Sequence, residues 1–286
     1  MRDGPRLGIH MSTSKGLETT LKGAKELGCM SIQIFSGNPR SLAAKVIPMP
    51  QGSTWGQRCH AEGIHPVVSH TGYMVQVASS RTDLQLPIQQ ALEAELIRCE
   101  ALGCAYSVVH LGSRGDAAPA QGVANVVGMV QRTLDNTAGC SVRLLLENTA
   151  GSGNLVGAEF EELADIWQRL ESFHDRLGFC FDTAHAFAAG YDLATADGMK
   201  RTLEQLDSVI GLEVVYAIHV NDTSIPLGGR RDAHQHIGQG NIGTLAFAAI
   251  LNHPKLAGRP FLLETKGDEK VEGRRNLEAL RVLIET

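Results

Sequence analysis

Eight short apolar runs recur along the chain of 286 residues, and segments with helical periodicity lie between them. The runs are rich in Val, Ile, Leu and Phe, and they are continuous rather than alternating. This is typical of strands that are buried on both faces of a parallel sheet. The expected strands are Leu7–His10, Ser31–Phe35, Pro66–His70, Ser107–His110, Arg143–Glu147, Gly178–Asp182, Tyr216–Val220 and Pro260–Glu264.

Apolar residues at helical spacing between these runs predict helices that pack on the sheet. One such stripe, Leu17–Leu27, stops at Gly28, and another, Ile88–Leu102, stops at Gly103, a residue type that often follows the last helical turn. A third stripe runs over 160–170. Strands that alternate with helices in this number predict one α/β domain over residues 1–286, a (β/α)8 TIM barrel. A doubly wound open sheet is the alternative.

The polar residues at the ends of the expected strands favour the barrel. In a barrel, active-site groups come from the carboxyl ends of several strands, whereas an open sheet concentrates them near one switch point. Five histidines and four carboxylates fall at or just past such ends, or in the loops that follow. They are His70, His110, Glu147, Asp182, His185, His219, Asp232, His234 and Glu264.

This number of candidate ligands predicts more than one metal ion, because a zinc ion usually takes four. Glu147 follows three leucines, and Glu264 follows Phe-Leu-Leu, so each must be paired or metal-bound if it is buried. His185 is expected in the loop after Asp182, where both can face one site. Mixed histidine and carboxylate ligands suit zinc, with manganese or iron as alternatives, and a group of close ions suits hydrolysis of a phosphodiester.

Two further polar or reactive residues are expected to play supporting roles. Asp222 is expected in a turn or behind the ligands, and Cys180, which lies inside an apolar run, is expected to pack rather than bind metal. The six cysteines form no CxxC pair, no apolar run is long enough to span a bilayer, and the first residues lack the apolar core of a signal peptide. A reduced, cytoplasmic protein without a membrane partner is therefore expected.

The net charge of −5 argues against broad, nonspecific attraction to nucleic acid. It leaves room for a local basic surface. Three bound divalent ions would bring the total charge to about +1, since bound cations dominate the electrostatics around them.

Three segments resemble the signatures of endonuclease IV, a family of apurinic/apyrimidinic endonucleases. They are Glu147–Gly151, Phe181–Asp192 and Asp232–Gly243, and the similarity extends from Ile9 to Glu264. The resemblance implies a TIM barrel of the xylose isomerase-like superfamily and a monomer. It also implies an activity: hydrolysis of duplex DNA on the 5′ side of an abasic site, leaving a 3′-hydroxyl and a 5′-deoxyribose phosphate.

The resemblance further implies a centre of three zinc ions, with manganese or iron as an alternative at one position. The implied ligands are His70, His110 and Glu147 for one ion, Glu147, Asp182, His219 and Glu264 for the second, and His185, Asp232 and His234 for the third. Glu147 and Glu264 are the implied catalytic residues. Glu264 is expected to orient or deprotonate the attacking nucleophile.

The implied contacts with DNA lie on two loops and are Asn38, Arg40, Tyr73 and Met74. A cation and an apolar wedge at the minor groove make physical sense at a gap in the base stack. The chain departs from the family pattern at several places without losing a ligand, and these departures bear on DNA affinity and loop geometry. They are Gly37 where lysine is common, Leu42 where tryptophan is common, Gln76 for asparagine and Ala233 for arginine.

Two other functions fit parts of the pattern. A sugar isomerase or epimerase of the related barrels would generally need fewer ligands, and the pairs Asp182/His185 and Asp232/His234 argue against it. A protein that binds damaged DNA without cutting it could keep the fold. The intact ligand set argues against that alternative, because buried unpaired carboxylates would destabilise a protein that held no metal.

Overall fold

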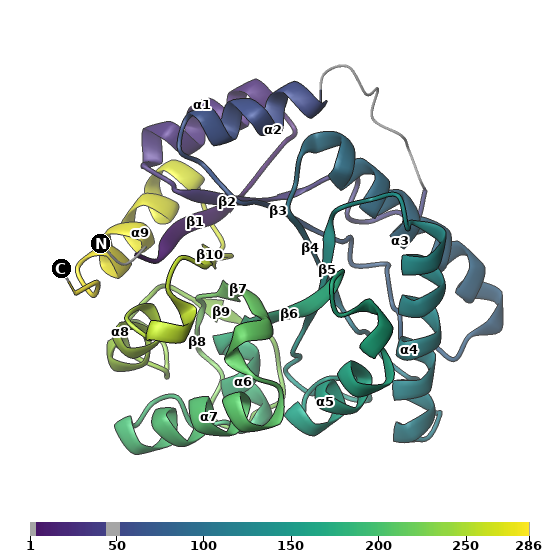
Figure 1. Ribbon diagram of the computed structural model, residues 1–286. Coiled ribbons are helices and arrows are strands. Elements are labelled where there is room, and N and C mark those ends of the chain that lie inside the picture. The colour runs from purple at the N-terminus through teal and green to yellow at the C-terminus, as the bar shows by residue number, and fades with distance from the viewer. Residues whose placement is uncertain (1–3, 44–51, 286) are drawn as a thin grey trace.

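The computed structural model describes residues 4–43 and 52–285; residues 1–3, 44–51 and 286 lie outside this description. Within the described part, eight parallel strands close into a barrel in the order β1-β10-β7-β6-β5-β4-β3-β2, and helices surround it (Figure 1). The predicted (β/α)8 barrel is confirmed. The open-sheet alternative is wrong, because β1 pairs with both β2 and β10 and so closes the sheet on itself.

The strands lie within a residue or two of their expected positions. The barrel strands are β1 (Arg6–Met11), β2 (Ser31–Phe35), β3 (Val67–His70), β4 (Tyr106–His110), β5 (Arg143–Glu147), β6 (Leu177–Asp182), β7 (Val215–His219) and β10 (Pro260–Leu263). The described α-helices are α1 (Leu17–Leu27), α2 (Gly52–Ala61), α3 (Thr82–Leu102), α4 (Pro119–Asn136), α5 (Phe160–Arg169), α6 (Thr183–Ala189), α7 (Ala196–Val209), α8 (Thr244–Leu251) and α9 (Arg274–Arg281).

The helices end and pack as their sequences predict. Gly28 and Gly103 follow α1 and α3 in the left-handed conformation, and their N–H groups return to carbonyls of the last turn. The buried stripes of α1, α3 and α5 face one continuous core that lies between the helices and the outer face of the barrel. The last helix, α9, lies beside β1 and so closes the ring (Figure 1).

The interior of the barrel is built in layers, because every second residue of a strand points inward. A buried apolar layer consists of Val68, Val108, Leu145, Cys180, Ala217 and Leu262. Two residues further along the same strands come His70, His110, Glu147, Asp182, His219 and Glu264. The polar residues therefore form the next layer, at the carboxyl ends of the strands. Cys180 packs in the apolar layer as expected, and burial raises the pKa of its thiol to about 12.

A small antiparallel hairpin lies outside the barrel. It consists of β8 (Asp222–Thr223) and β9 (His234–Gln235), with Thr223 opposite His234. The fully buried carboxylate of Asp222 accepts hydrogen bonds from the N–H groups of Thr223, Gly238, Gly240 and Ile242 at 2.8–3.1 Å. Asp222 lies in β8 rather than in the expected turn, and it supports the ligands from behind, because its hydrogen bonds hold the segment that carries Asp232 and His234. Among the described helices, none has the length and apolarity that crossing a bilayer requires.

Candidate metal centre

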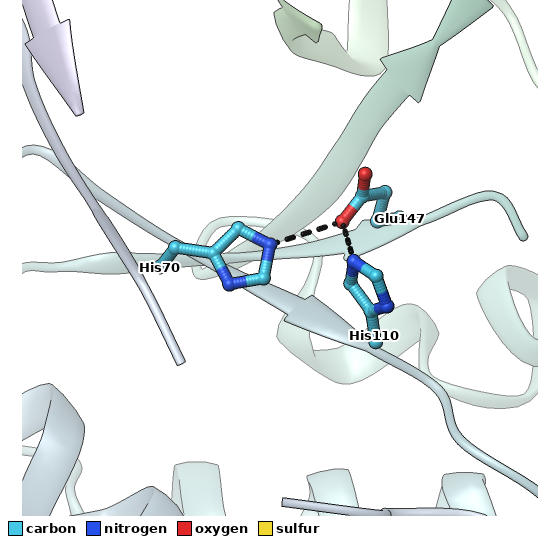
Figure 2. A group of neighbouring side chains, drawn as sticks. All are labelled: His70, His110 and Glu147. Carbon is cyan, nitrogen blue, oxygen red and sulfur yellow. Dashed lines mark hydrogen bonds and ion pairs between the residues drawn. The ribbon is translucent and has the colours of Figure 1, made fainter. Parts of the chain in front are cut away.

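Glu147 at the end of β5 is the centre of the polar layer. Its carboxylate is fully buried and lies against four histidines from other segments. Oε2 lies 2.8 Å from Nε2 of His110 and 3.2 Å from Nε2 of His70. Figure 2 shows both rings directed at this one oxygen. Oε1 lies 2.8 Å from Nδ1 of His219 and 3.4 Å from Nδ1 of His185. One carboxylate thus joins histidines from β3, β4, α6 and β7.

The ligand-type atoms form three overlapping groups, within each of which they lie no more than 4.8 Å apart. The groups are His70, His110 and Glu147; Glu147, Asp182, His219 and Glu264; and Asp182, His185 and His234. Glu147 and Asp182 each belong to two groups. This overlap places the groups side by side at the mouth of one barrel.

Asp232 lies at the edge of this cluster. Its side chain is 51% exposed, and its carboxylate oxygens lie 3.5 Å from Nε2 of His185 and 3.1 Å from Nε2 of His234. The group that contains His185 and His234 has Asp182 as its carboxylate, whereas the family resemblance implies Asp232. All nine candidate ligands are thus brought together, and Asp232 is more exposed than His110, whose side chain is 36% exposed.

The expectation that His185 lies in a loop is wrong, because it lies in the first turn of α6. Asp182 caps this helix: its Oδ1 accepts a hydrogen bond from the backbone N–H of His185 at 2.8 Å. The following residues are largely alanine, the strongest helix former. The helix begins directly at the strand end, and this turns the imidazole of His185 back over the barrel mouth.

Backbone carbonyls fix the ring orientation of two histidines. Nδ1 of His70 donates to the carbonyl of Thr71 at 2.8 Å, and Nδ1 of His185 donates to the carbonyl of Asn148 at 2.9 Å. A carbonyl oxygen only accepts, so in the neutral imidazole the proton sits on Nδ1, and Nε2 offers a lone pair. Metal-binding histidines typically have this second hydrogen bond.

The buried charges in the cluster stabilise one another. Burial alone would raise the pKa of Glu147, but the charges of His110 and His219 outweigh it and hold the pKa well below its usual range. Burial likewise opposes the charged form of Glu264, yet His219, with His70 and His234, lowers its pKa to about 2. The pKa of His234 rises to about 9, because the hydrogen bond of Asp232 and the charge of Asp182 exceed the effect of burial.

This donor set fits divalent metal ions. Imidazole nitrogens and carboxylate oxygens are the ligands that zinc takes in proteins, and buried carboxylates such as Glu147 and Asp182 require a cation or a proton nearby. Without metal, protons on His185 and His219 meet that requirement, because the neighbouring carboxylates raise the pKa of both rings well above its usual value. Metal ions would meet it with the same atoms.

Two asparagines that were not expected at the site hold its carboxylates in place. Asn148 pairs with the backbone of Asp182 in both directions, at 2.7 and 3.0 Å. Asn221 donates to Asp182 Oδ2 at 2.8 Å and to Glu264 Oε2 at 3.2 Å. Asn148 could have been predicted as a site residue, because it directly follows Glu147 and a buried amide must have hydrogen-bond partners.

A cavity of about 300 Å³ lies over the cluster, and one of the two loops expected to contact DNA, the loop after β3, reaches it through Tyr73. Tyr73 lines this cavity, and its ring lies 5.7 Å from that of Phe35. The backbone N–H of Tyr73 donates to the carbonyl of Pro39 at 2.8 Å, which joins the loop after β3 to the loop after β2. Asn38 accepts from the N–H of Arg40 at 3.0 Å within that second loop.

On the two loops expected to contact DNA, the exposed side chains include aromatic, apolar and cationic ones. Tyr73 is 62% exposed, Met74 is 50% exposed, and Arg40 is exposed as well. The Gln76 amide braces the loop, since it donates to the carbonyl of Tyr73 and accepts from the N–H of Ser113, both at 3.0 Å. A role for these residues in DNA binding stays a prediction.

Comparison with known proteins agrees with the fold and the site. The family model described as a xylose isomerase-like TIM barrel matches residues 21–285. A probable endonuclease 4 from Chloroflexus aggregans is 40% identical over 281 residues, which cover 98% of each chain. A probable endonuclease 4 from Solibacter usitatus is 40% identical over 97% of this chain and 96% of its own.

Solved structures separate the family from the wider fold. The crystal structure of endonuclease IV from Thermus thermophilus matches with a TM-score of 0.86 at 34% identity, over 98% of both chains. A D-tagatose 3-epimerase-like protein matches with a TM-score of 0.72 over 97% of this chain and 98% of its own, but at 18% identity, so that likeness concerns the fold alone. On the full-length similarity to its relatives, this chain belongs to the endonuclease IV family.

Proposed function

We propose that this protein is a metal-dependent endonuclease that repairs DNA in the cytoplasm. It hydrolyses the phosphodiester on the 5′ side of an abasic site in duplex DNA and leaves a 3′-hydroxyl and a 5′-deoxyribose phosphate. Residues 1–286 act as one catalytic domain and as a monomer. The observation that carries the proposal is the set of three overlapping donor groups at the mouth of one barrel.

The donor groups support a centre of three ions, most simply zinc, with manganese or iron as the alternative at one position. One ion would be held by His70, His110 and Glu147, and a second by Glu147, Asp182, His219 and Glu264. The third would be held by His185, His234 and Asp232, with Asp182 close by. Bound ions of this kind supply an activated water nucleophile and neutralise charge on the phosphate and the leaving oxygen.

Glu264 and Glu147 have different tasks in this scheme. Glu264 lines the cavity, and its side chain is 16% exposed, so it can meet the substrate and orient or accept a proton from the attacking water. Glu147 is fully buried, and it keeps two donor groups at a fixed separation. Asn221 restrains Oε2 of Glu264 and Oδ2 of Asp182 together. General acid–base assistance of this type contributes about 10²- to 10⁴-fold to a rate.

The two loops expected to contact DNA supply the features that recognise a gap in the base stack. An abasic nucleotide leaves its neighbours unstacked, and this lowers the cost of extruding it from the duplex. Tyr73 lines the cavity, the exposed Met74 follows it in the chain, and Arg40 adds a positive charge for the DNA backbone. Insertion of apolar side chains into a base step is a known way to kink DNA at the minor groove.

An incision assay tests the proposal. A labelled duplex with one tetrahydrofuran abasic analogue is incubated with metal-loaded protein and with protein stripped by a chelator. We expect a single cut on the 5′ side of the analogue with the loaded protein and none with the stripped protein. A loaded protein that binds the duplex without cutting it would support the damage-binding alternative, and epimerisation of a ketose without DNA cleavage would support the sugar-enzyme alternative.

A further inference from the structure

Gln33 is a fully buried amide in the middle of β2, and it makes three side-chain hydrogen bonds at the barrel mouth. Its Nε2 donates to Oε1 of Glu264 at 2.6 Å and to Nδ1 of His10 at 3.0 Å. Its Oε1 accepts from Nε2 of His219 at 2.8 Å. One side chain thus connects three segments at the barrel mouth.

The carboxylate of Glu264 determines which way the amide points. An ionised carboxylate only accepts hydrogen bonds, so the NH2 group of Gln33 must face Glu264. The oxygen of Gln33 then faces His219, and Nε2 of His219 must be the donor. In the neutral imidazole this places the proton on Nε2 and leaves the lone pair on Nδ1.

That lone pair points to the other ligands. Nδ1 of His219 lies 2.8 Å from Oε1 of Glu147, 3.3 Å from Oε2 of Glu264 and 3.7 Å from Oδ2 of Asp182. The tautomer that Gln33 selects is therefore the one in which His219 can bind an ion together with these carboxylates. The same amide restrains the oxygen of Glu264 that Asn221 does not contact.

We propose that Gln33 is a positioning residue that fixes His219 as an Nδ1 ligand with its oxygen and orients Glu264 with its NH2 group. The inference rests on the proposed function, because it assigns the residue to a metal-holding site. It gives the two ends of one amide separate tasks. Partners of this kind around metal ligands typically contribute about 10- to 100-fold to metal affinity or activity.

Two substitutions separate the tasks. Gln33→Glu keeps an oxygen that accepts from His219 but places a second carboxylate against Glu264, so it should displace Glu264 and lose the donor to His10 while His219 keeps its acceptor. Gln33→Met has a similar length and no hydrogen-bonding group of this kind, so it should release all three partners. Ser31→Ala is the matched control: Ser31 is fully buried in the same strand, and its hydroxyl donates to the carbonyl of Pro66 at 2.6 Å, away from the cluster.

The readouts are Co²⁺ binding, followed by the visible spectrum and by titration, and steady-state incision of an abasic duplex. For Gln33→Glu we expect kcat lowered about 10- to 100-fold with KM little changed, and weaker binding of the cobalt ion that Glu264 helps to hold. For Gln33→Met we expect weaker binding of at least one cobalt ion, by about 10- to 100-fold, and an altered spectrum. Ser31→Ala should keep the parent spectrum and kcat.

The outcomes are distinguishable. Parent-like cobalt binding and kcat in both Gln33 variants would overturn the inference and leave the proposed function standing. A parent chain that binds no cobalt would overturn the proposed function, and the inference with it. If Gln33→Met does not fold, Gln33→Glu decides alone, because an unchanged kcat in that variant contradicts the role assigned to the NH2 group.

Discussion

Replacing Asp222 by asparagine should release the segment that carries two of the candidate ligands. Each carboxylate oxygen of Asp222 accepts two backbone N–H groups: Oδ1 those of Thr223 and Ile242, and Oδ2 those of Gly238 and Gly240. In asparagine one of these oxygens becomes an NH2 group, which cannot accept. Either rotamer therefore leaves two N–H groups without an acceptor: the buried pair of Thr223 and Ile242, or the part-buried pair of Gly238 and Gly240.

The expected loss follows from that count. A buried donor left without its partner costs about 1–3 kcal/mol, so two cost about 2–6 kcal/mol, and the part-buried pair of Gly238 and Gly240 lies at the lower end. The segment can open without unfolding the barrel, so the loss should appear first as local opening. Even the lower bound of about 2 kcal/mol corresponds to a roughly 30-fold faster exchange of the amide protons of Gly238, Gly240 and Ile242.

Native-state hydrogen exchange measures this directly, and metal content measures its consequence, because Asp232 and His234 lie on the same segment. Asp207→Asn is the control: that carboxylate also accepts a backbone N–H, from Leu212 at 3.0 Å, but lies outside the cluster. Gly240→Ala should act like Asp222→Asn, since a Cβ at Gly240 would collide with Oδ1 of Asp222. Parent-like exchange and parent-like metal content in Asp222→Asn would refute the reasoning.

Three further outcomes are expected. Glu264→Gln should keep its affinity for an abasic duplex in a binding titration, while single-turnover incision slows about 10²- to 10⁴-fold; a rate near that of the parent would exclude the proposed role. Glu95→Gln should lower the free energy of unfolding in urea by about 3–5 kcal/mol, because it breaks the buried pair with Arg98 at 2.6 Å; a loss below about 1 kcal/mol would contradict this. At pH 8 the half-buried Cys140 should react first with a thiol reagent, because the other five cysteines are buried and burial raises the pKa of Cys59, for example, to about 12; mass spectrometry of the labelled peptides would show any other order.

The barrel could be predicted because its strands are continuous apolar runs that end on polar residues. The expected bounds of Ser31–Phe35 and Arg143–Glu147 match the structure, and the others differ by a residue or two. The hairpin of β8 and β9 could not be predicted in this way. Each of its strands has two residues, which is too short for a periodic pattern, and the hydrogen bonds to Asp222 determine its shape.

The candidate ligands could be found one by one, since each interrupts or follows an apolar run, but their grouping could not. Spacing along the chain does not decide whether Asp232 or Asp182 lies closer to His185 and His234. The carboxylate that lies beside His185 is determined by α6, which is capped by Asp182 and turns His185 back toward the cluster. A short helix that starts at a capping aspartate, directly at a strand end, has no periodic pattern that distinguishes it from a loop.

Gln33 can be singled out from the sequence, but its partners cannot. An amide between Ile32 and Ile34 in a buried strand must have partners, and this rule alone singles the residue out. Its partners are unpredictable, since His219 and Glu264 lie 186 and 231 residues further along the chain. Closure of the barrel brings them together: β1, which carries His10, pairs with β2 on one side and with β10 on the other, and Glu264 follows β10. The interior of a closed barrel thus completes the surroundings of a ligand with residues from distant strands, and a search among sequence neighbours cannot find them.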